Sequence, residues 1–396
     1  MLVDDASTGR RIPAVALVAR SGTMRTWGLG PDLRTIAADL DAARSIPGLV
    51  PVLRLVTRTG REMRAVPGQS LRTVRGWAPI ESIRCDERIA VARTLPPPEV
   101  PDDLGVEEAE ILGMLAARPL GRANDASGAA LFRCKDPDVV AALGDLMLAV
   151  HGQVTSIARR GEARIGLRVT DDLRGWACRE APVEEVPVRA YGAGDAALAR
   201  FLGGFWSASG SAGTEERRPS AELRGLSAAQ VAGLQHLLLR VGVLAVARAS
   251  RGDDDGMPSV LLVSGTDPLG ALGALPLRGE FAASMARVLA DPSRLKDADL
   301  DYLPEEVTQA LKRVSDGVLH GIHAHDAGGH GWELSRREYD EAIDALPASS
   351  SFRAWAGSAV LWDAVVSIET DGLAMCHEVR IRGAQGLLVN DIWVQG

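Results

Sequence analysis

Cysteine is scarce in this chain. Its 396 residues include four cysteines, and none of them forms a C-x-x-C pair. A chain of this length can bury a sizeable core without cross-links, so we expect free thiols in a reducing cytosol rather than disulfides or zinc ligands. The four are Cys85, Cys134, Cys178 and Cys376.

Long apolar runs are also missing. No run approaches the roughly 20 apolar residues that a helix needs to cross a bilayer. The only apolar run before Arg20 is IPAVALVA, and Asp4 and Asp5 precede it, which makes a poor signal peptide. We therefore expect a cytoplasmic protein that does not bind membranes.

An excess of positive charge is absent. The formal net charge is -8, and only Lys135, Lys296 and Lys312 among the 44 basic residues are lysines. Affinity for DNA of any sequence comes mostly from basic residues that neutralise phosphates, so this charge excludes a tight, sequence-independent DNA binder. A hydrophobic content of 46% indicates a soluble chain of two or three domains with a proper core.

The chain does contain an internal repeat. Two apolar stretches rich in small residues, Ile111 to Gly121 and Phe201 to Gly210, read as helices. One such helix alone indicates only close packing. Here each is followed in the same order by a strand, an amphipathic helix and a hairpin, and a period of about 90 residues is too long for a solenoid. The predicted strands are Ala130–Cys134 and Ala221–Arg224, the amphipathic helices Pro137–Val150 and Ser227–Arg240, and the hairpin turns Arg160-Gly161 and Gly252–Gly256.

This repeat resembles the LAGLIDADG homing endonucleases, in particular the two-motif kind carried inside inteins. In that family two motif helices pack through small residues, and the last turn of each delivers one acid that holds divalent metal at the DNA. The resemblance places these acids at Arg118 and Ser209, and the closing glycines at Pro119 and Gly210.

Neither Arg118 nor Ser209 can replace a metal-binding carboxylate. Hard cations need carboxylate or carbonyl oxygens, and two-metal hydrolysis needs them to hold both ions at the phosphate. A guanidinium about 4 Å from a divalent ion repels it by about 8 kcal/mol at an effective dielectric constant of about 20. The resemblance thus implies an endonuclease by ancestry that neither binds the Mg²⁺ of its family nor cleaves DNA.

The flanks of the repeat resemble the two parts of an intein splicing domain of the Hint type. Residues 49–96 alternate apolar and polar residues around turn signals, as short antiparallel strands do. The likeness covers nearly the whole chain and is strongest to the replicative DNA helicase inteins of actinobacteria. The matching segments are Thr59-Gly60-Arg61, Gly76-Trp77, Asp86–Arg93, Leu361–Gly372 and His377–Gly396, which includes Asn390-Asp391-Ile392.

The residues that would carry out splicing are missing. The family's threonine and histidine fall on Val66 and Gln69, which leaves no imidazole to protonate a leaving amide. Met1 stands where an intein has its nucleophile, and Gln395 and Gly396 stand where it has its final His-Asn pair. Because the chain begins and ends at intein boundaries, we expect a free-standing, degenerate element with nothing to ligate.

Together these patterns predict an α+β protein. We expect a split all-β Hint-like domain, a pseudo-twofold LAGLIDADG α/β domain and a small helical segment. The predicted ranges are 1–100 and 355–396 for the Hint-like domain, 104–270 for the endonuclease-like domain with halves 104–190 and 191–270, and 271–352 for the helical segment. Within them we predict an exposed loop at Thr214 to Pro219 and helices at Glu305 to Leu319 and Ser335 to Leu346.

Two further groups of side chains could bind a partner. The hairpins of the family form a saddle over DNA, but charged residues on an outer face also keep a protein soluble, so both interpretations stay open. The arginines that would contact DNA are Arg159, Arg160, Arg164, Arg168, Arg248 and Arg251. The second group is a histidine cluster whose spacing suits zinc or nickel, although its Gly-rich stretch favours a solvated loop. It comprises His320, His323, His325 and His330.

Three functions remain open at this point. The favoured one is a degenerate intein and homing-endonuclease-like monomer with internal pseudo-twofold symmetry, inactive in splicing and cleavage, that retains weak binding to double-stranded DNA. The second is an active endonuclease that uses acids outside the motifs, such as Asp125 or Glu215. The third is a protein-interaction or metal-binding module.

Overall fold

The computed structural model divides the chain into two compact units. Unit 1 comprises Met1–Pro96 and Asp299–Gly396, and unit 2 comprises Pro97–Ala298. The structure describes residues 1–396 except 123–129, 153–155, 160–164, 216–217, 250–257, 291–300, 315–324, 327–331 and 345–350. Unit 1 is thus discontinuous in sequence, and unit 2 is inserted into it.

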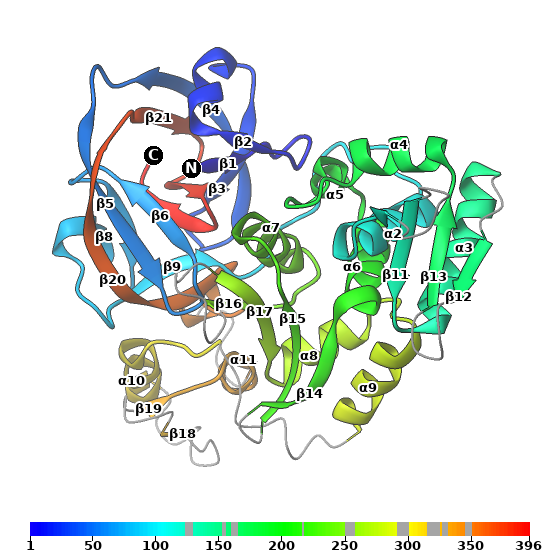
Figure 1. The fold of residues 1–396 in the computed structure, drawn as a ribbon. Helices are drawn as coiled ribbons and strands as arrows, with labels where there is room; N and C mark the ends of the chain where they lie inside the picture. Colours follow the sequence, from blue (N-terminus) through cyan, green and yellow to red (C-terminus); the bar gives the residue numbers. More distant parts are fainter. Residues whose placement is uncertain are drawn as a thin grey trace. The chain divides into compact units, whose positions relative to one another are not determined.

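Unit 1 is built on a sheet whose described pairings are antiparallel, in the order β21-β4-β3-β22-β23-β7-β9-β20-β5-β6 (Figure 1). Strand β1 pairs with β2 and β22, and β8 pairs with β7. The predicted short strands within 49–96 are confirmed. The strands are β1 (Leu2–Asp4), β2 (Arg11–Pro13), β3 (Arg25–Leu29), β4 (Thr35–Ser45), β5 (Val50–Thr57), β6 (Glu62–Ala65), β7 (Ser70–Thr73), β8 (Gly76–Pro79), β9 (Arg88–Ala92), β20 (Val360–Ala374), β21 (His377–Arg382), β22 (Gly386–Val389) and β23 (Ile392–Val394).

Strand β20 joins two parts of this sheet. Its first residues, Val360 to Ala364, pair with β9, and Val365 to Ala374 pair with β5, with register shifts between Val365 and Ser367 and between Thr370 and Leu373. Such irregularities bend a strand. The side chains of Trp362, Val365 and the β9 residues Ile89 to Ala92 are buried, so the junction lies in the core of unit 1.

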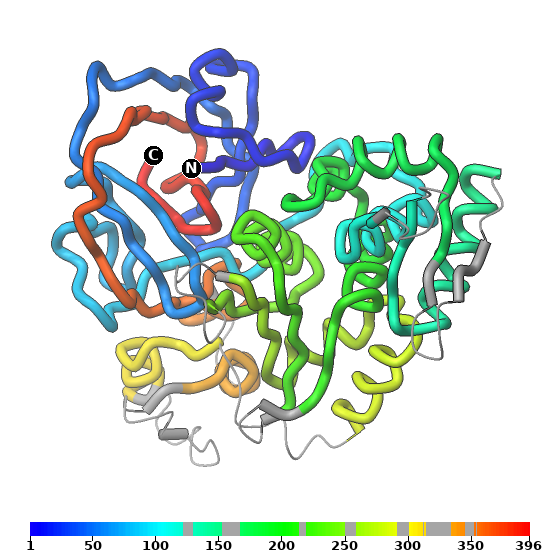
Figure 2. Tube along the Cα trace, viewed as in Figure 1, coloured from blue at the N-terminus to red at the C-terminus, as the bar shows by residue number. Residues whose placement is uncertain are grey.

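The two ends of the chain lie beside each other in unit 1 (Figure 2). Val3 of β1 pairs with Val389 of β22, next to the turn Asn390-Asp391. Both turn residues have positive φ, 48° and 63°, as a two-residue hairpin turn of matching twist requires. The Asn390 side chain accepts a hydrogen bond from the Leu2 N–H at 2.8 Å and donates one to the Glu62 carbonyl at 3.0 Å.

A small helical part of unit 1 precedes β20. Its elements are α10 (Glu305–Val314), β18 (His325–Asp326), β19 (Trp332–Glu333) and α11 (Arg336–Asp344). Buried Arg336 anchors it, because its guanidinium donates to the Val360 carbonyl at 2.9 Å and lies 3.4 Å from the Asp301 carboxylate. The predicted segment 271–352 spans the division at Ala298, and its boundaries, like the other domain limits, stay a prediction.

Unit 2 contains the same succession of elements twice. It contains two four-stranded sheets, β10-β11-β13-β12 and β14-β15-β17-β16. In each sheet the strands that come first, second, fourth and third along the chain lie side by side in that order. The first half contains α2 (Val106–Ala117), β10 (Gly121–Arg122), β11 (Ala130–Cys134), α3 (Pro137–His151), β12 (Ser156–Arg159), β13 (Ile165–Val169), α4 (Asp171–Glu180) and α5 (Val188–Gly192). The second contains α6 (Asp195–Ser209), β14 (Ser211–Glu215), β15 (Arg218–Arg224), α7 (Ala228–Leu239), β16 (Val246–Ala249), β17 (Pro258–Ser264), α8 (Thr266–Gly273) and α9 (Gly279–Leu289).

Local signals explain where the amphipathic helices begin and end. Asp136 caps α3, and left-handed Gly152 ends it at φ 65°. Helix α7 begins with a capping box between Ser227 and Gln230. Both predicted helices are confirmed to within one residue at each end. The predicted hairpin turns lie outside the described residues.

The predicted loop at Thr214 to Pro219 is wrong for the described residues. Strands β14 and β15 continue into it, and Thr214 pairs with Pro219. Pro219 precedes the pairing of β15 with β17, which begins at Ser220, so it faces no partner on that side of the strand. The protein is α+β, and within the described residues no helix is long and apolar enough to cross a membrane.

Candidate functional site at the paired helices

Helices α2 and α6 pack against each other between the two sheets of unit 2 (Figure 1). A Cβ atom on Gly113 would overlap the carbonyl oxygen of Phe201, and one on Gly204 would lie 2.5 Å from the carbonyl oxygen of Glu110. Each helix therefore needs a glycine where the backbone of the other approaches. The small residues noted in the sequence explain this close approach.

The rest of both helices forms the centre of the core. On α2 the side chains of Ile111 and Leu112 are fully buried, and on α6 those of Phe201, Phe205 and Trp206 are fully buried. Burying one such side chain contributes about 1.5–3 kcal/mol. This burial holds the two helices together.

The C-terminal ends of α2 and α6 meet at Arg118. Arg118 is the C-cap of α2, and its Nε donates to the carbonyl oxygen of Ala208 at 3.3 Å. The Ser209 hydroxyl donates back to the Phe205 carbonyl within α6 at 3.2 Å. A helix C-terminus carries partial negative charge on its unpaired carbonyls, so a guanidinium stabilises it. The structure therefore brings Arg118 and Ser209 to adjacent helix ends, and a cation of the protein itself is bound there.

Cys134 of β11 lies at the same place. Its Sγ is 3.8 Å from the Ala208 carbonyl oxygen. Burial raises the pKa of the Cys134 thiol, and the nearby charge of Arg118 opposes this increase. The thiol therefore stays protonated at neutral pH and is a poor metal ligand, because metals bind the thiolate.

Asp136 is a nearby carboxylate that sequence reasoning did not single out. One oxygen accepts from the Asp138 N–H at 2.9 Å, and the other accepts from the Glu280 N–H at 2.5 Å. Asp136 therefore caps the N-termini of α3 and α9 together. The Asp-Pro pair before an amphipathic helix is a signal that could have revealed the first cap, but nothing in the sequence points to the second.

Glu110 is a second acid that the sequence did not reveal as a site residue. It is 2% exposed, lies in the middle of α2, and accepts from the guanidinium of Arg278 and from that of Arg200, both at 3.1 Å. The hydrogen bond with Glu110 raises the pKa of Arg278. Glu110 thus ties the segment before α9 to the helix pair, and its oxygens are committed to this role.

The described residues offer no cluster of metal ligands at the helix ends. No group of three His, Cys, Asp or Glu side chains converges there in the described part of the chain. Of the acids considered as substitutes, Asp125 lies outside the described residues, and only the backbone of Glu215 is described, in β14.

Three of the six predicted DNA-contacting arginines lie within the described strands. Arg168 of β13 and Arg248 of β16 are exposed. Arg159 ends β12 and pairs with Ile165, and its side chain is not described. Arg160, Arg164 and Arg251 lie outside the described residues.

Of the positions predicted for splicing, Val66, Gln69 and Gln395 lie together in unit 1. Gln69, in the turn after β6, donates from Nε2 to the Gln395 carbonyl at 2.9 Å, and the Gln395 N–H donates to the Ser70 carbonyl at 2.9 Å. The Val66 carbonyl accepts from the Gln69 N–H, and the Met1 carbonyl accepts from the Ala14 N–H. Gly396 lies beside Ile381 of β21.

A buried polar network joins two of the matched segments. The Thr59 hydroxyl donates to the Asp363 carboxylate, and Arg61 donates to Thr59 at 2.5 Å and to the Ala92 carbonyl at 3.4 Å. Burial lowers the pKa of the Arg61 guanidinium, and the charges of Asp391 and Asp363 oppose this decrease. Both carboxylates therefore compensate a buried cation.

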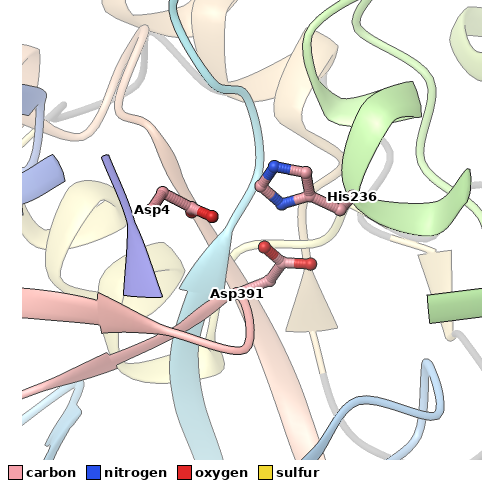
Figure 3. Close-up of side chains that lie close together, drawn as sticks. All are labelled: Asp4, His236 and Asp391. Atoms are coloured by element: carbon pink, nitrogen blue, oxygen red, sulfur yellow. The ribbon is translucent and has the colours of Figure 1, made fainter. Parts of the chain in front are cut away.

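Two buried carboxylates of unit 1, Asp4 and Asp391, lie near each other (Figure 3). Asp4 of β1 pairs across the strands with Arg11 of β2, and its carboxylate lies 3.5 Å from the Arg11 Nε. His236, which the same picture labels, belongs to α7 of unit 2 and lies there with its ring 5.9 Å from that of Tyr191. In the core of unit 1, the Asp4 carboxylate faces the Arg11 guanidinium and the Asp391 carboxylate faces the Arg61 guanidinium, so these charges balance.

The histidine cluster cannot be assembled from the described residues. His325 lies in β18 and pairs with Glu333 of β19. The positions of His320, His323 and His330 lie outside the described residues, and the side chain of His325 is not described.

A relative among known proteins aligns with nearly the whole of this chain. No family model matches the chain. The chain is 26% identical, over an alignment of 428 residues, to the replicative DNA helicase DnaB of Rhodothermus marinus; the alignment covers 97% of this chain and 44% of that protein. The chain thus spans less than half the length of this curated relative.

Solved structures give weaker likenesses. The G-1F mutant of the Ssp DnaB mini-intein variant M86 is 11% identical, with coverage of 100% of this chain and 94% of that one and a TM-score of 0.33. The homing endonuclease I-DmoI in complex with DNA and Ca is 16% identical, with coverage of 46% and 98% and a TM-score of 0.34.

Proposed function

We propose that the chain is a degenerate intein of the replicative DNA helicase type, with an inserted LAGLIDADG-like unit that binds double-stranded DNA weakly and does not cleave it. Three observations support the ancestry. The matched sequence segments fall in a discontinuous β-rich unit, the inserted unit repeats one succession of elements, and the relative aligned over 97% of the chain is a helicase. Actinobacterial origin, a monomeric state and a cytoplasmic location stay predictions.

The contact between Arg118 and Ala208 supports the loss of cleavage most directly. Two helix C-termini meet there, and their partial negative charge is met by a guanidinium that donates to the last turn of α6. A divalent ion at this place would face the same guanidinium without a carboxylate from either position 118 or 209. Within the described residues, the helix ends therefore lack both the ligands and the net charge that two-metal hydrolysis needs.

The side chains at the predicted splicing positions of unit 1 support the loss of splicing in the same way. Val66 has no polar side-chain atom, and the amide of Gln69 neither gains nor loses a proton near neutral pH. The Gln69 amide is instead used to bind the Gln395 carbonyl. General acid catalysis by a group at this turn is therefore not available to the chain.

A plasmid-cleavage assay tests the proposal. The substrate is a supercoiled plasmid that carries the uninterrupted helicase sequence, with Mg²⁺ or Mn²⁺ present. We expect no nicking by the unmodified chain and some nicking by the double variant Arg118→Asp, Ser209→Asp, because only this variant places oxygen ligands at both helix ends.

The matched control is Arg118→Ala with Ser209→Ala, which removes the guanidinium and adds no ligand. We expect it to be as inactive as the unmodified chain. Nicking by the unmodified chain would show that acids elsewhere act as ligands, and the proposal of an inactive endonuclease would be wrong.

A further inference from the structure

Strand β8 lies at an edge of the unit 1 sheet. Within the described residues it pairs only with β7, and it ends at Pro79, which is exposed. Proline within a sheet is confined mainly to edge strands, because it has no N–H to donate to a neighbour. An edge strand presents backbone groups with which an added strand can pair. We call the side of β8 that faces away from β7 the open edge.

The hydrogen bonds at the far end of the β7–β8 hairpin show which backbone groups face the open edge. The Gln69 carbonyl accepts from the Ile80 N–H across the hairpin, whereas the Ser70 carbonyl accepts from a residue outside it, both at 2.9 Å. Opposite residues of an antiparallel pair alternate between bonded and non-bonded pairs, so Arg72 and Trp77 form a non-bonded pair. The N–H and the carbonyl of Trp77 therefore point toward the open edge.

The Arg72 side chain lies over the indole ring of Trp77. Its guanidinium carbon is 5.8 Å from the ring centroid. The ring packs against Gly386, where a Cβ atom would lie 2.5 Å from it. Within the described residues, a Cβ atom on Gly76 would meet only the Arg72 Nη1, at 3.8 Å, so the space beside the guanidinium is open. The guanidinium thus lies on an aromatic surface that a ligand can approach.

The charge of Arg72 is not compensated by an acid. Burial lowers the pKa of the guanidinium groups of Arg61, Arg240 and Arg72. Carboxylates oppose this decrease for Arg61 and Arg240, but no charged group among the described residues opposes it for Arg72. Charges that are removed from water are normally paired in proteins, and the planar fork of a guanidinium matches a carboxylate. A carboxylate from a ligand would therefore complete this site.

We infer that the open edge of β8 binds an extended acidic peptide, whose main chain pairs with the Trp77 backbone and whose carboxylate pairs with Arg72. Neighbouring strands lie about 4.8 Å apart, so a residue added opposite Trp77 is about 10 Å from the Arg72 backbone. The side chains of a glutamate and an arginine together span this distance. In such strand addition the main chain supplies affinity and the side chains supply selectivity. This binding goes beyond the proposed function and does not depend on DNA.

Fluorescence anisotropy with the full chain tests the inference. The probe is a short fluorescein-labelled peptide of alternating valine and glutamate. The net charge of -8 disfavours an acidic peptide, so its binding reports local contacts. We expect saturable binding of this peptide. For the same peptide with glutamine in place of glutamate we expect an affinity at least about tenfold lower, because it cannot form a charge-assisted pair.

Arg72→Met is expected to weaken binding of the glutamate peptide about tenfold. The matched control is Arg75→Met, which removes the same charge from the turn of the same hairpin, where the side chain is 81% exposed. We expect its affinity to stay within about twofold of the unmodified chain. Because methionine replaces a half-buried charge without an acid, Arg72→Met is expected to keep its Tm within about 3 °C, so weaker binding does not reflect unfolding.

Backbone methylation of the peptide tests the strand pairing. If a glutamate lies opposite Trp77, its N–H faces the open edge and the N–H groups of the valines face away. Methylation of the glutamate nitrogens is therefore expected to weaken binding at least about tenfold, and methylation of the valine nitrogens to change it by less than about threefold. Free glutarate is the competitor that carries the carboxylate without the main chain, and we expect it to displace the peptide poorly.

The outcomes distinguish the inference from its alternatives. Equal affinities of Arg72→Met and Arg75→Met, or of the glutamate and glutamine peptides, would overturn the role of Arg72. Equal affinities of the two methylated peptides, or displacement by glutarate as strong as by unlabelled peptide, would show a site for free carboxylates and overturn strand addition. Absence of saturable binding to the unmodified chain would overturn the inference as a whole, while the proposed DNA binding would stand.

Discussion

Replacing Gly113 with alanine is expected to lower the free energy of unfolding of unit 2 by about 3 kcal/mol or more. The added methyl would overlap the Phe201 carbonyl and lie 3.0 Å from the Phe205 backbone nitrogen. Both atoms are backbone of α6, so no side chain can move aside and the helices must separate. Urea denaturation, with hydrogen exchange of α2 and α6 peptides to localise the effect, measures the loss.

Gly270→Ala in α8 is the matched control for this substitution. A Cβ atom at Gly270 meets nothing within 4 Å, and alanine is the better helix former. We expect a gain of up to about 1 kcal/mol. If Gly113→Ala were as well tolerated as Gly270→Ala, the close approach of α2 and α6 would be wrong.

Replacing Arg61 with methionine is expected to cost about 3–5 kcal/mol, because it leaves buried carboxylates without their cation. Arg61 is 3% exposed, and the charges facing it are those of Asp363 and Asp391. Asp363 is itself 4% exposed, so water cannot take over the role of the guanidinium. Chemical denaturation of the full chain measures the change.

Arg58→Met controls for the loss of an arginine from the same turn. Its side chain is 53% exposed and lies 3.9 Å from the exposed carboxylate of Asp86, so a change within about 0.5 kcal/mol is expected. The double variant Arg61→Met, Asp363→Leu should recover part of the loss, since both charges are then gone. An Arg61→Met chain as stable as Arg58→Met would contradict the network.

The sequence predicted what depends on local patterns. The apolar periodicity predicted two amphipathic helices, and α3 and α7 form there, bounded by Asp136 and Gly152 and by the capping box of Ser227 and Gln230. The repeat predicted from the sequence is present in the structure as two sheets with the same strand order. The turn at Asn390-Asp391 follows from the tolerance of Asn and Asp for positive φ.

Contacts between distant segments could not be predicted in this way. Glu110 and Arg278 are separated by 168 positions, and Arg118 meets Ala208 across 90. No periodicity indicates which arginine reaches a given carboxylate or carbonyl. The sequence predicted that position 118 lacks a metal-binding carboxylate. The structure shows that the Arg118 guanidinium donates a hydrogen bond to the Ala208 carbonyl instead.

The effect of Mg²⁺ on thermal stability tests the central claim, that the paired helix ends hold no divalent ion. Tm is compared in MgCl₂ and in NaCl of equal ionic strength, for the unmodified chain and for Arg118→Asp with Ser209→Asp. We expect no Mg²⁺-specific gain for the unmodified chain. For the double variant we expect about 1.4 kcal/mol at a Mg²⁺ concentration about tenfold above its Kd, because only its helix ends supply carboxylates. An equal gain in both proteins would contradict the account.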